Sequence, residues 1–265
     1  MRPDIRPHHR ETIANLVQAY EQDPRFLAII IGGSVAKGCA RKDSDVDFMI
    51  LAQEDEFEAR SAKGDLFINR TDLSTYPGGF VDGKIINLDY LHQVAEKGNE
   101  PTRAAFDAAI IAHSKIDGLE ELLAQISAYP EKGREERLRS FYAMSFIQNW
   151  LMGEAEHHGN LYTQSRAASQ LSLFAGRLIL AHNRIFFPYH KWLMHYLEKC
   201  PHKPHDFIEN IHRLLKEPNV YHAKTLFESV RQFQNWGVSD LEAYTWFMTE
   251  VEWSWMKGTT PLEDL

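Results

Sequence analysis

The sequence predicts an α+β fold, with a small mixed sheet in its first half and an all-helical bundle in its second. Before residue 129 the chain contains several short apolar runs of strand length, and after it the apolar residues recur at helical spacing. Between the two halves, Tyr129 to Gly133 combines proline, glycine and charged residues, which is typical of a domain boundary. We therefore expect one domain over residues 1–129 and a second over residues 130–265.

The composition is that of an ordinary globular protein. Of the 265 residues, 44% are hydrophobic and 25% are charged, and the length suits two modest domains. No apolar run approaches the ~20 residues that span a bilayer, and the polar start of the chain lacks the apolar core of a signal peptide. The formal net charge is −8 without a basic stripe, which argues against a general DNA or RNA binder. These features predict a cytoplasmic protein with no membrane partner and no DNA partner.

The first half alternates predicted strands and helices. Residues 65–83 are harder to assign, because Tyr76-Pro77-Gly78-Gly79 signals a loop that either borders the substrate site or is structural filler. Elsewhere we predict a short helix or turn at residues 34–38, strands at residues 26–31, 45–51, 84–90 and 108–113, and helices at residues 10–22, 54–62 and 119–126.

The second half is predicted to be helical. Pro188 should break a long helix or start the next one, because proline lacks the N–H that a helix interior requires. Ser239, with Glu242 three residues later, marks the start of the last helix. We predict helices at residues 135–157, 164–187, 206–215, 223–236 and 240–256.

One stretch of the first half carries the candidate site. Ile29-Ile30-Ile31 leads into Gly32-Gly33-Ser34, and after a short gap Asp45-Val46-Asp47 opens a second strand. Side chains alternate along a strand, so Asp45 and Asp47 are expected on the same face, with Cα atoms roughly 7 Å apart.

Two neighbouring carboxylates repel each other, and a divalent cation removes the conflict. Mg²⁺ takes carboxylate and phosphate oxygens while it keeps some of its waters. The glycines let backbone N–H groups approach an anion, and the helix start that follows them is suited to phosphate. The pattern therefore indicates a metal at Asp45 and Asp47 and phosphate groups at Gly33 and Ser34.

This arrangement resembles the polymerase-beta-like nucleotidyltransferase superfamily. Gly33 to Gly38, followed by Ser44-Asp45-Val46-Asp47, looks most like its small antibiotic-modifying branch, which contains the aminoglycoside and lincosamide nucleotidyltransferases. The resemblance implies the superfamily's sheet domain followed by a helical domain. It also implies a transfer of a nucleoside monophosphate from an NTP, with ATP expected, to a hydroxyl of a small acceptor such as an aminoglycoside-like antibiotic. Pyrophosphate leaves, and two Mg²⁺ ions are expected.

The resemblance also implies roles for individual residues. Asp45 and Asp47 would hold the metal ions, and Asp89, at the end of a predicted strand, would join one metal or act as a general base. The alternative for Asp89 is a strand-end or helix-cap aspartate. Ser44 would either orient the phosphate or brace the strand that carries Asp45. Lys191 beside aromatic residues would either reach the triphosphate or be a surface lysine with a packed stem.

Two other functions stay open on the sequence alone. Arg184 and His190 fit the loose Arg–His spacing of HEPN-type ribonucleases, which would suit a toxin–antitoxin protein that modifies or cleaves RNA or a protein partner. The other is a nucleotide-binding module without catalysis, although the intact Gly33, Asp45 and Asp47 argue against it. The sequence names neither the acceptor nor the oligomeric state.

Overall fold

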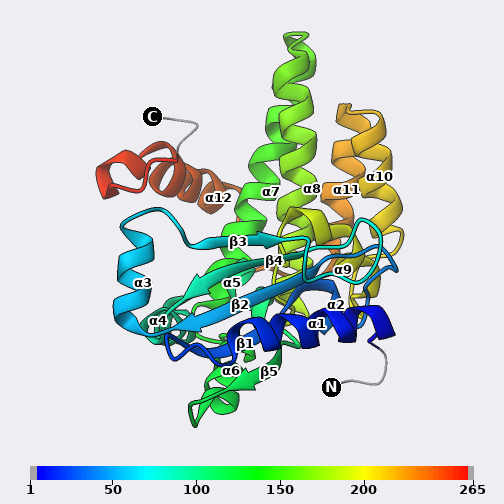
Figure 1. Ribbon diagram of the computed structural model, residues 1–265. Coiled ribbons are helices and arrows are strands. Elements are labelled where there is room, and N and C mark those ends of the chain that lie inside the picture. The colour runs from blue at the N-terminus through cyan, green and yellow to red at the C-terminus, as the bar shows by residue number, and fades with distance from the viewer. Residues whose placement is uncertain (1–4, 262–265) are drawn as a thin grey trace. The chain divides into compact units, whose positions relative to one another are not determined.

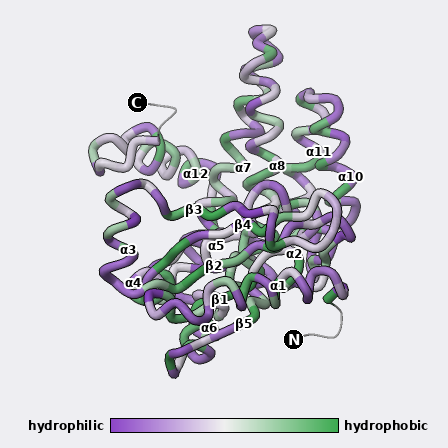
Figure 2. The backbone as a smooth tube through the Cα atoms, in the orientation of Figure 1, coloured by the Kyte–Doolittle hydropathy of each residue, from purple (hydrophilic) through white to green (hydrophobic). Residues whose placement is uncertain are grey.

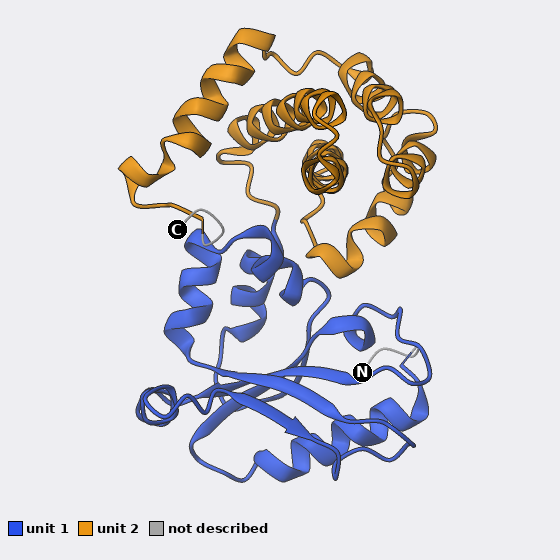
Figure 3. Ribbon diagram, turned by 90° about the horizontal axis from the view of Figure 1, so that it is seen from above, with its two compact units in different colours: residues 1–128 blue, residues 129–265 orange. Residues whose placement is uncertain are grey.

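The chain forms two compact units, unit 1 over residues 1–128 and unit 2 over residues 129–265 (Figure 3). The computed structural model describes residues 5–261. Unit 1 contains a mixed sheet with helices, and unit 2 is helical, so the predicted α+β fold class is confirmed. None of the helices within residues 5–261 has the length and apolar content that a membrane crossing requires.

A mixed sheet is the scaffold of unit 1. Its strands in the described part of the chain are β1 (Phe26–Ile31), β2 (Val46–Ala52), β3 (Phe67–Arg70), β4 (Val81–Ile86) and β5 (Ile110–Ser114). They lie in the order β3-β4-β2-β1-β5 (Figure 1). β2 is parallel to β4, and the other neighbours are antiparallel. This parallel pair brings the starts of β2 and β4 to the same edge of the sheet.

The two faces of the sheet are covered by different helices. Phe48 of β2 packs in one buried cluster with α1 (Pro7–Tyr20). Met49, which points to the other face, packs in a second cluster with α4 (Leu88–Lys97) and α6 (Leu119–Ser127). A strand buried on both faces reads as a continuous apolar run, which Figure 2 shows for β1 and β2. The other helices of unit 1 are α2 (Gly33–Ala36), α3 (Glu54–Ser61) and α5 (Glu100–Phe106).

The strand predicted at residues 84–90 is wrong at both ends. β4 starts earlier, inside the segment that could not be assigned from sequence, and ends at Ile86. The cause is Asn87, whose side chain accepts a hydrogen bond from the N–H of Tyr90 and so caps α4. Ile86, Leu88 and Tyr90 alternate with polar residues as a strand would, but this cap turns Leu88 onward into a helix.

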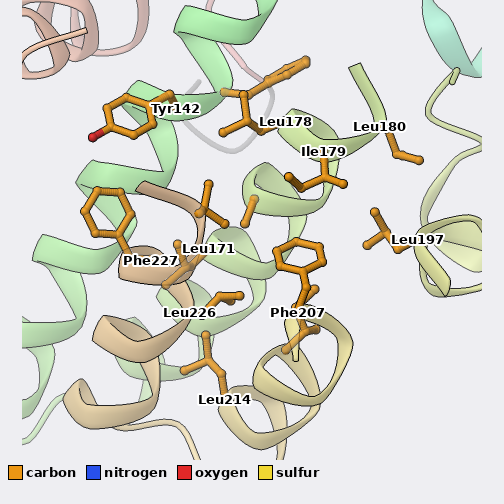
Figure 4. Close-up of a cluster of buried hydrophobic side chains, with 14 of the residues drawn as sticks. Tyr142, Leu171, Leu178, Ile179, Leu180, Leu197, Phe207, Leu214, Leu226 and Phe227 are labelled. Carbon is orange, nitrogen blue, oxygen red and sulfur yellow. The ribbon is translucent and has the colours of Figure 1, made fainter. Parts of the chain in front are cut away.

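Unit 2 has its own buried core, part of which Figure 4 shows. Tyr142 and Phe227 lie in this core with ring centroids 5.8 Å apart. The helices that enclose it include α7 (Arg134–His157), α8 (Leu161–His182), α9 (Leu193–Lys199), α10 (Phe207–Lys216) and α11 (Val220–Phe233). A short 3₁₀ turn, η1 (His190–Trp192), precedes α9.

Three helices of unit 2 end earlier than predicted, and one of them is α11, which was expected to end at residue 236 and ends at Phe233. The helix predicted at residues 164–187 is α8, which ends at His182, and Arg184 then has a φ of 57° that a right-handed helix excludes. The helix predicted at residues 240–256 is α12 (Asp240–Phe247), followed by a π turn, η2 (Met248–Glu252), and a 3₁₀ turn, η3 (Ser254–Lys257). The predicted start of α12 is confirmed, because Ser239 and Glu242 form a capping box.

Candidate functional site

The candidate site lies where β2 begins. Asp47 is the second residue of β2, and Asp45 immediately precedes the strand. Both residues are half-buried. Asp47 points to the face of the sheet opposite Val46 and Phe48, and Asp45 lies just outside the strand, near enough for its charge to raise the pKa of Asp82.

β4 brings a third carboxylate to the same edge of the sheet. In the parallel pairing of β2 with β4, Asp47 lies beside Asp82, and neighbouring strands are about 4.8 Å apart. Burial raises the pKa of Asp82, the nearby Asp45 raises it further, and Lys84 opposes both effects. Asp82 is therefore next to Asp47 in the sheet and repelled by the charge of Asp45.

The glycine turn after β1 touches Asp47 directly. Gly33 has a φ of 60°, and a Cβ atom placed on it would lie 1.7 Å from Oδ2 of Asp47. The N–H of Gly32 donates a hydrogen bond of 2.9 Å to the backbone carbonyl of Asp47. Glycine is required at position 33, because any side chain would need both a left-handed backbone and the space that the carboxylate occupies.

The turn that carries Gly33 also presents backbone N–H groups. α2 is a single turn, and the first N–H groups of a helix have no acceptor inside it. A helix this short has little macrodipole, so an anion here would depend on the individual N–H groups of Gly33 and Ser34. Val35 and Ala36 are buried in the same cluster as α1, which fixes the turn to the body of unit 1.

Ser44 is engaged with the chain around it. Its hydroxyl accepts a hydrogen bond of 2.9 Å from the N–H of Arg41, and its carbonyl accepts one from the hydroxyl of Tyr76. Of the two roles predicted for Ser44, these contacts favour bracing of the segment before Asp45.

Asp89 is not in the strand position that its predicted role required. It is exposed in the first turn of α4, beyond the far end of β4, and its carboxylate accepts a hydrogen bond from Gln93. Because β2 and β4 are parallel, the start of β2 adjoins the start of β4, where Asp82 lies. The strand position predicted for Asp89 is wrong, because β4 ends at Ile86 and Asp89 belongs to the first turn of α4. The third carboxylate at the site is that of Asp82.

Lys191 belongs to unit 2. It is exposed in η1, and its ammonium nitrogen lies 5.8 Å from the ring centroid of Trp192. This contact with an aromatic ring agrees with either of the roles predicted for it, so its part in nucleotide binding stays a prediction.

The donor set suits a hard divalent cation such as Mg²⁺ or Mn²⁺, because all three candidate ligands are carboxylates. Burial is the larger cause of the raised pKa of Asp82, and the charge of Asp45 adds to it. In the part of the chain that the structure describes, no three His, Cys, Asp or Glu side chains already stand at metal-binding geometry. A bound cation would therefore have to draw the carboxylates of Asp45, Asp47 and Asp82 together.

Comparison with known families agrees with this geometry. Residues 13–138 match the family model described as nucleotidyltransferase domain. The match runs through the whole sheet and both halves of the site, from the glycine turn to Asp82. It supports the resemblance drawn from the motif at the level of this domain, and it does not distinguish the antibiotic-modifying branch.

One solved structure that is similar to this chain is the crystal structure of a nucleotidyltransferase-like protein from Exiguobacterium sibiricum 255-15. The two are 10% identical, with a TM-score of 0.49, and the similarity covers 94% of this chain and 79% of that one. No curated protein matches the chain.

Sequence reasoning missed Asp82 although the nucleotidyltransferase pattern called for a third acid. The signal was present, because Val81, Gly83 and Ile85 alternate with Asp82 and Lys84 as the two faces of a strand. Because it contains Gly83, the start of this strand resembles the preceding glycine-rich loop in the sequence. In the structure Gly83 is needed inside the strand, since a Cβ there would lie 2.6 Å from the ring of Phe48.

Gly33→Ala should disable the site while the fold survives. The new Cβ would displace the carboxylate of Asp47, and a misplacement of about 1 Å at a reacting centre can lower a rate by ~100-fold. The left-handed backbone adds a destabilisation of about 1–2 kcal/mol. Gly64→Ala is the matched control, because Gly64 has a φ of 70° but nothing within 4 Å of its Cβ position. Equal losses of Mg²⁺-dependent NTP binding in the two variants would contradict the assigned contact with Asp47.

Asp82→Asn should stabilise the metal-free protein at neutral pH. The pKa of folded Asp82 lies above its ordinary value of 3.8, so ionisation of Asp82 opposes folding. This penalty is present at neutral pH and is lost as the pH falls through the raised pKa. The variant's gain in free energy of unfolding should therefore shrink toward about pH 4, as measured by urea unfolding in a chelator.

Asp89→Asn is the control for this measurement. Asp89 is exposed at the N-terminal end of α4, where a negative charge is favourable, so its removal should bring no gain. Added Mg²⁺ should raise the melting temperature of the wild type and of Asp89→Asn more than that of Asp82→Asn. The opposite ranking would restore Asp89 as the third ligand.

Proposed function

We propose that this protein transfers a nucleoside monophosphate, with ATP the expected donor, to a hydroxyl group of a small acceptor and releases pyrophosphate. The observation that carries the proposal is the group of three carboxylates, Asp45, Asp47 and Asp82, beside the glycine turn at Gly33. The nucleotidyltransferase-domain match over residues 13–138 supports the same reaction class.

In this proposal all three carboxylates help to bind the metal, and Asp82 also takes part in proton transfer. Asp45, Asp47 and Asp82 would hold Mg²⁺, which when bound supplies charge that neutralises the triphosphate and acidifies the acceptor hydroxyl. The acceptor oxygen attacks the α-phosphorus, the bond to the pyrophosphate oxygen breaks, and the hydroxyl proton passes to a carboxylate oxygen of Asp82.

The glycine turn, and not the carboxylates, would hold the phosphates. The backbone N–H groups of Gly33 and Ser34 are proposed to donate to the β- and γ-phosphates, in the manner of a glycine turn that leads into a helix. Lys191 of unit 2 remains the proposed basic contact for the triphosphate, with the surface-lysine alternative still open.

The acceptor is proposed as a small hydroxylated molecule of the aminoglycoside-like kind. The net charge of −8 is weak support for a cationic acceptor, since such a charge also serves solubility. The ribonuclease alternative gains no support, because the guanidinium of Arg184 is engaged with the carboxylate of Glu131. A silent binding module would have no need for a third carboxylate that repels the other two.

The proposal predicts that the protein binds Mg²⁺-NTP far more tightly than Mg²⁺-NMP. Charge-assisted hydrogen bonds to the β- and γ-phosphates are worth about 1.5–3 kcal/mol each, so two of them correspond to roughly 100-fold or more in affinity. Discrimination among ATP, GTP, CTP and UTP should be weaker than this. The binding should need the metal, because the carboxylates would otherwise repel the triphosphate.

Calorimetry with a non-hydrolysable ATP analogue and AMP, with and without Mg²⁺, tests this prediction. Asp47→Asn serves as the companion variant, because it keeps the shape of the side chain and removes the charge. Equal affinities for the triphosphate and monophosphate, or an ATP affinity that a chelator leaves unchanged, would overturn the proposed function.

A further inference from the structure

The start of α1 holds the connection that joins the glycine turn to β2. Three side chains of α1 and its N-cap each donate a hydrogen bond to a carbonyl of this connection. The acceptors are alternate residues, and they lie in and beside the turn that the N–H of Ser44 closes by donating to the carbonyl of Arg41. They are Arg6 Nε to Ala40 at 3.5 Å, His8 Nε2 to Lys42 at 3.0 Å and His9 Nε2 to Ser44 at 3.1 Å.

The carbonyl of Ser44 is the point where two elements meet. It accepts from His9 of α1 and also from the hydroxyl of Tyr76, which lies in the loop between β3 and β4. A carbonyl oxygen only accepts hydrogen bonds, so Nε2 of His9 must carry the ring proton. The ring of Tyr76 packs against His8 and His9 with centroid distances of 4.6 Å and 5.2 Å. The loop is thereby tied to α1 as well as to Ser44.

His9 is buried, and its ring donates a hydrogen bond to the carbonyl of Ser44. It is fully buried, with 0% of its surface exposed. Its other ring nitrogen, Nδ1, has no hydrogen-bond partner in the part of the chain that is described, so Nε2 alone fixes its polar end. Buried hydrogen bonds hold geometry more strongly than exposed ones, because no water competes for them.

The contact matters because Ser44 directly precedes Asp45 in the chain. The carbonyl of Ser44 lies in the same rigid peptide plane as the backbone nitrogen of Asp45. Asp45 precedes β2 and is therefore outside the strand ladder that holds Asp47. Two hydrogen bonds to Ser44 fix the plane from which Asp45 projects, and they do so against the repulsion between Asp45 and Asp82.

We propose that His9 and Tyr76 are positioning residues for Asp45, which they hold through the carbonyl of Ser44 at the start of β2, where a cation can draw it toward Asp47 and Asp82. This inference rests on the proposed function, since it assigns Asp45 to the metal. It gives the loop over residues 71–80 a role at the site through Tyr76. It also gives a reason for the two adjacent histidines of α1, because His8 and His9 both donate hydrogen bonds to the segment before β2.

The test measures the Mg²⁺ concentration that gives half-maximal binding of a non-hydrolysable ATP analogue. Tyr76→Phe removes only the hydroxyl, and His9→Leu removes the ring donor. Each should raise that concentration about fivefold, the effect of one lost hydrogen bond, and the double variant should raise it further. His9→Gln should restore it toward the wild-type value, because the amide nitrogen of glutamine can replace Nε2. If His9 served stability alone, His9→Leu would lower the melting temperature, and His9→Gln would not bring the Mg²⁺ midpoint back toward the wild-type value.

Tyr20→Phe is the matched control. Tyr20 ends α1 and its hydroxyl accepts a hydrogen bond from Arg70 at 3.4 Å, away from the connection before β2. If Tyr76→Phe, His9→Leu and Tyr20→Phe all keep the wild-type Mg²⁺ midpoint, the positioning role is overturned while the proposed function stands. If the wild-type protein itself binds the analogue equally with and without Mg²⁺, the proposed function is wrong and the positioning role is overturned with it.

Discussion

Three carboxylates that share one edge of a sheet repel each other, and the arrangement of unit 1 around β2 and β4 holds them there. The parallel register sets Asp82 beside Asp47, and the charge of Asp45 adds to the burial that raises the pKa of Asp82. Folding alone would not favour this gathering of like charges. A divalent cation that binds all three would turn the repulsion into attraction.

The scaffold tolerates this unfavourable group because the strands around it are buried on both faces. α1 covers one face of the sheet, and α4 and α6 cover the other, so β2 has little freedom to move its charges apart. Gly33 closes against Asp47 with no room for a side chain, and the turn that carries it is anchored by Val35. The same rigidity keeps the backbone N–H groups of the turn beside the carboxylates, where a metal-bound triphosphate would need them.

Sequence alone predicted the α+β class, the strand at residues 26–31 and the link between the glycine turn and Asp45 and Asp47. These signals are local, since an apolar run, a glycine pair and an alternating acid pair are read within a few residues. The third carboxylate has a local signal in the alternation of β4, but its place beside Asp47 cannot be read from the sequence. Its position depends on the register between β2 and β4, and a glycine inside β4 together with the Asn87 cap moved the predicted strand onto Asp89. The contacts of His9 and Tyr76 with Ser44 join segments far apart in sequence, and no local sequence pattern predicts them.

We propose that Asp45, Asp47 and Asp82 bind one group of divalent ions. Anomalous diffraction from crystals soaked in Mn²⁺ and a non-hydrolysable ATP analogue tests it most directly, because Mn²⁺ replaces Mg²⁺ at oxygen sites and identifies itself by its scattering. We expect a peak bound by carboxylate oxygens of Asp47 and Asp82, with Asp45 as a further ligand and phosphate oxygens completing the shell. A peak at Asp89, or nucleotide in the site with no peak at Asp47 and Asp82, would contradict it.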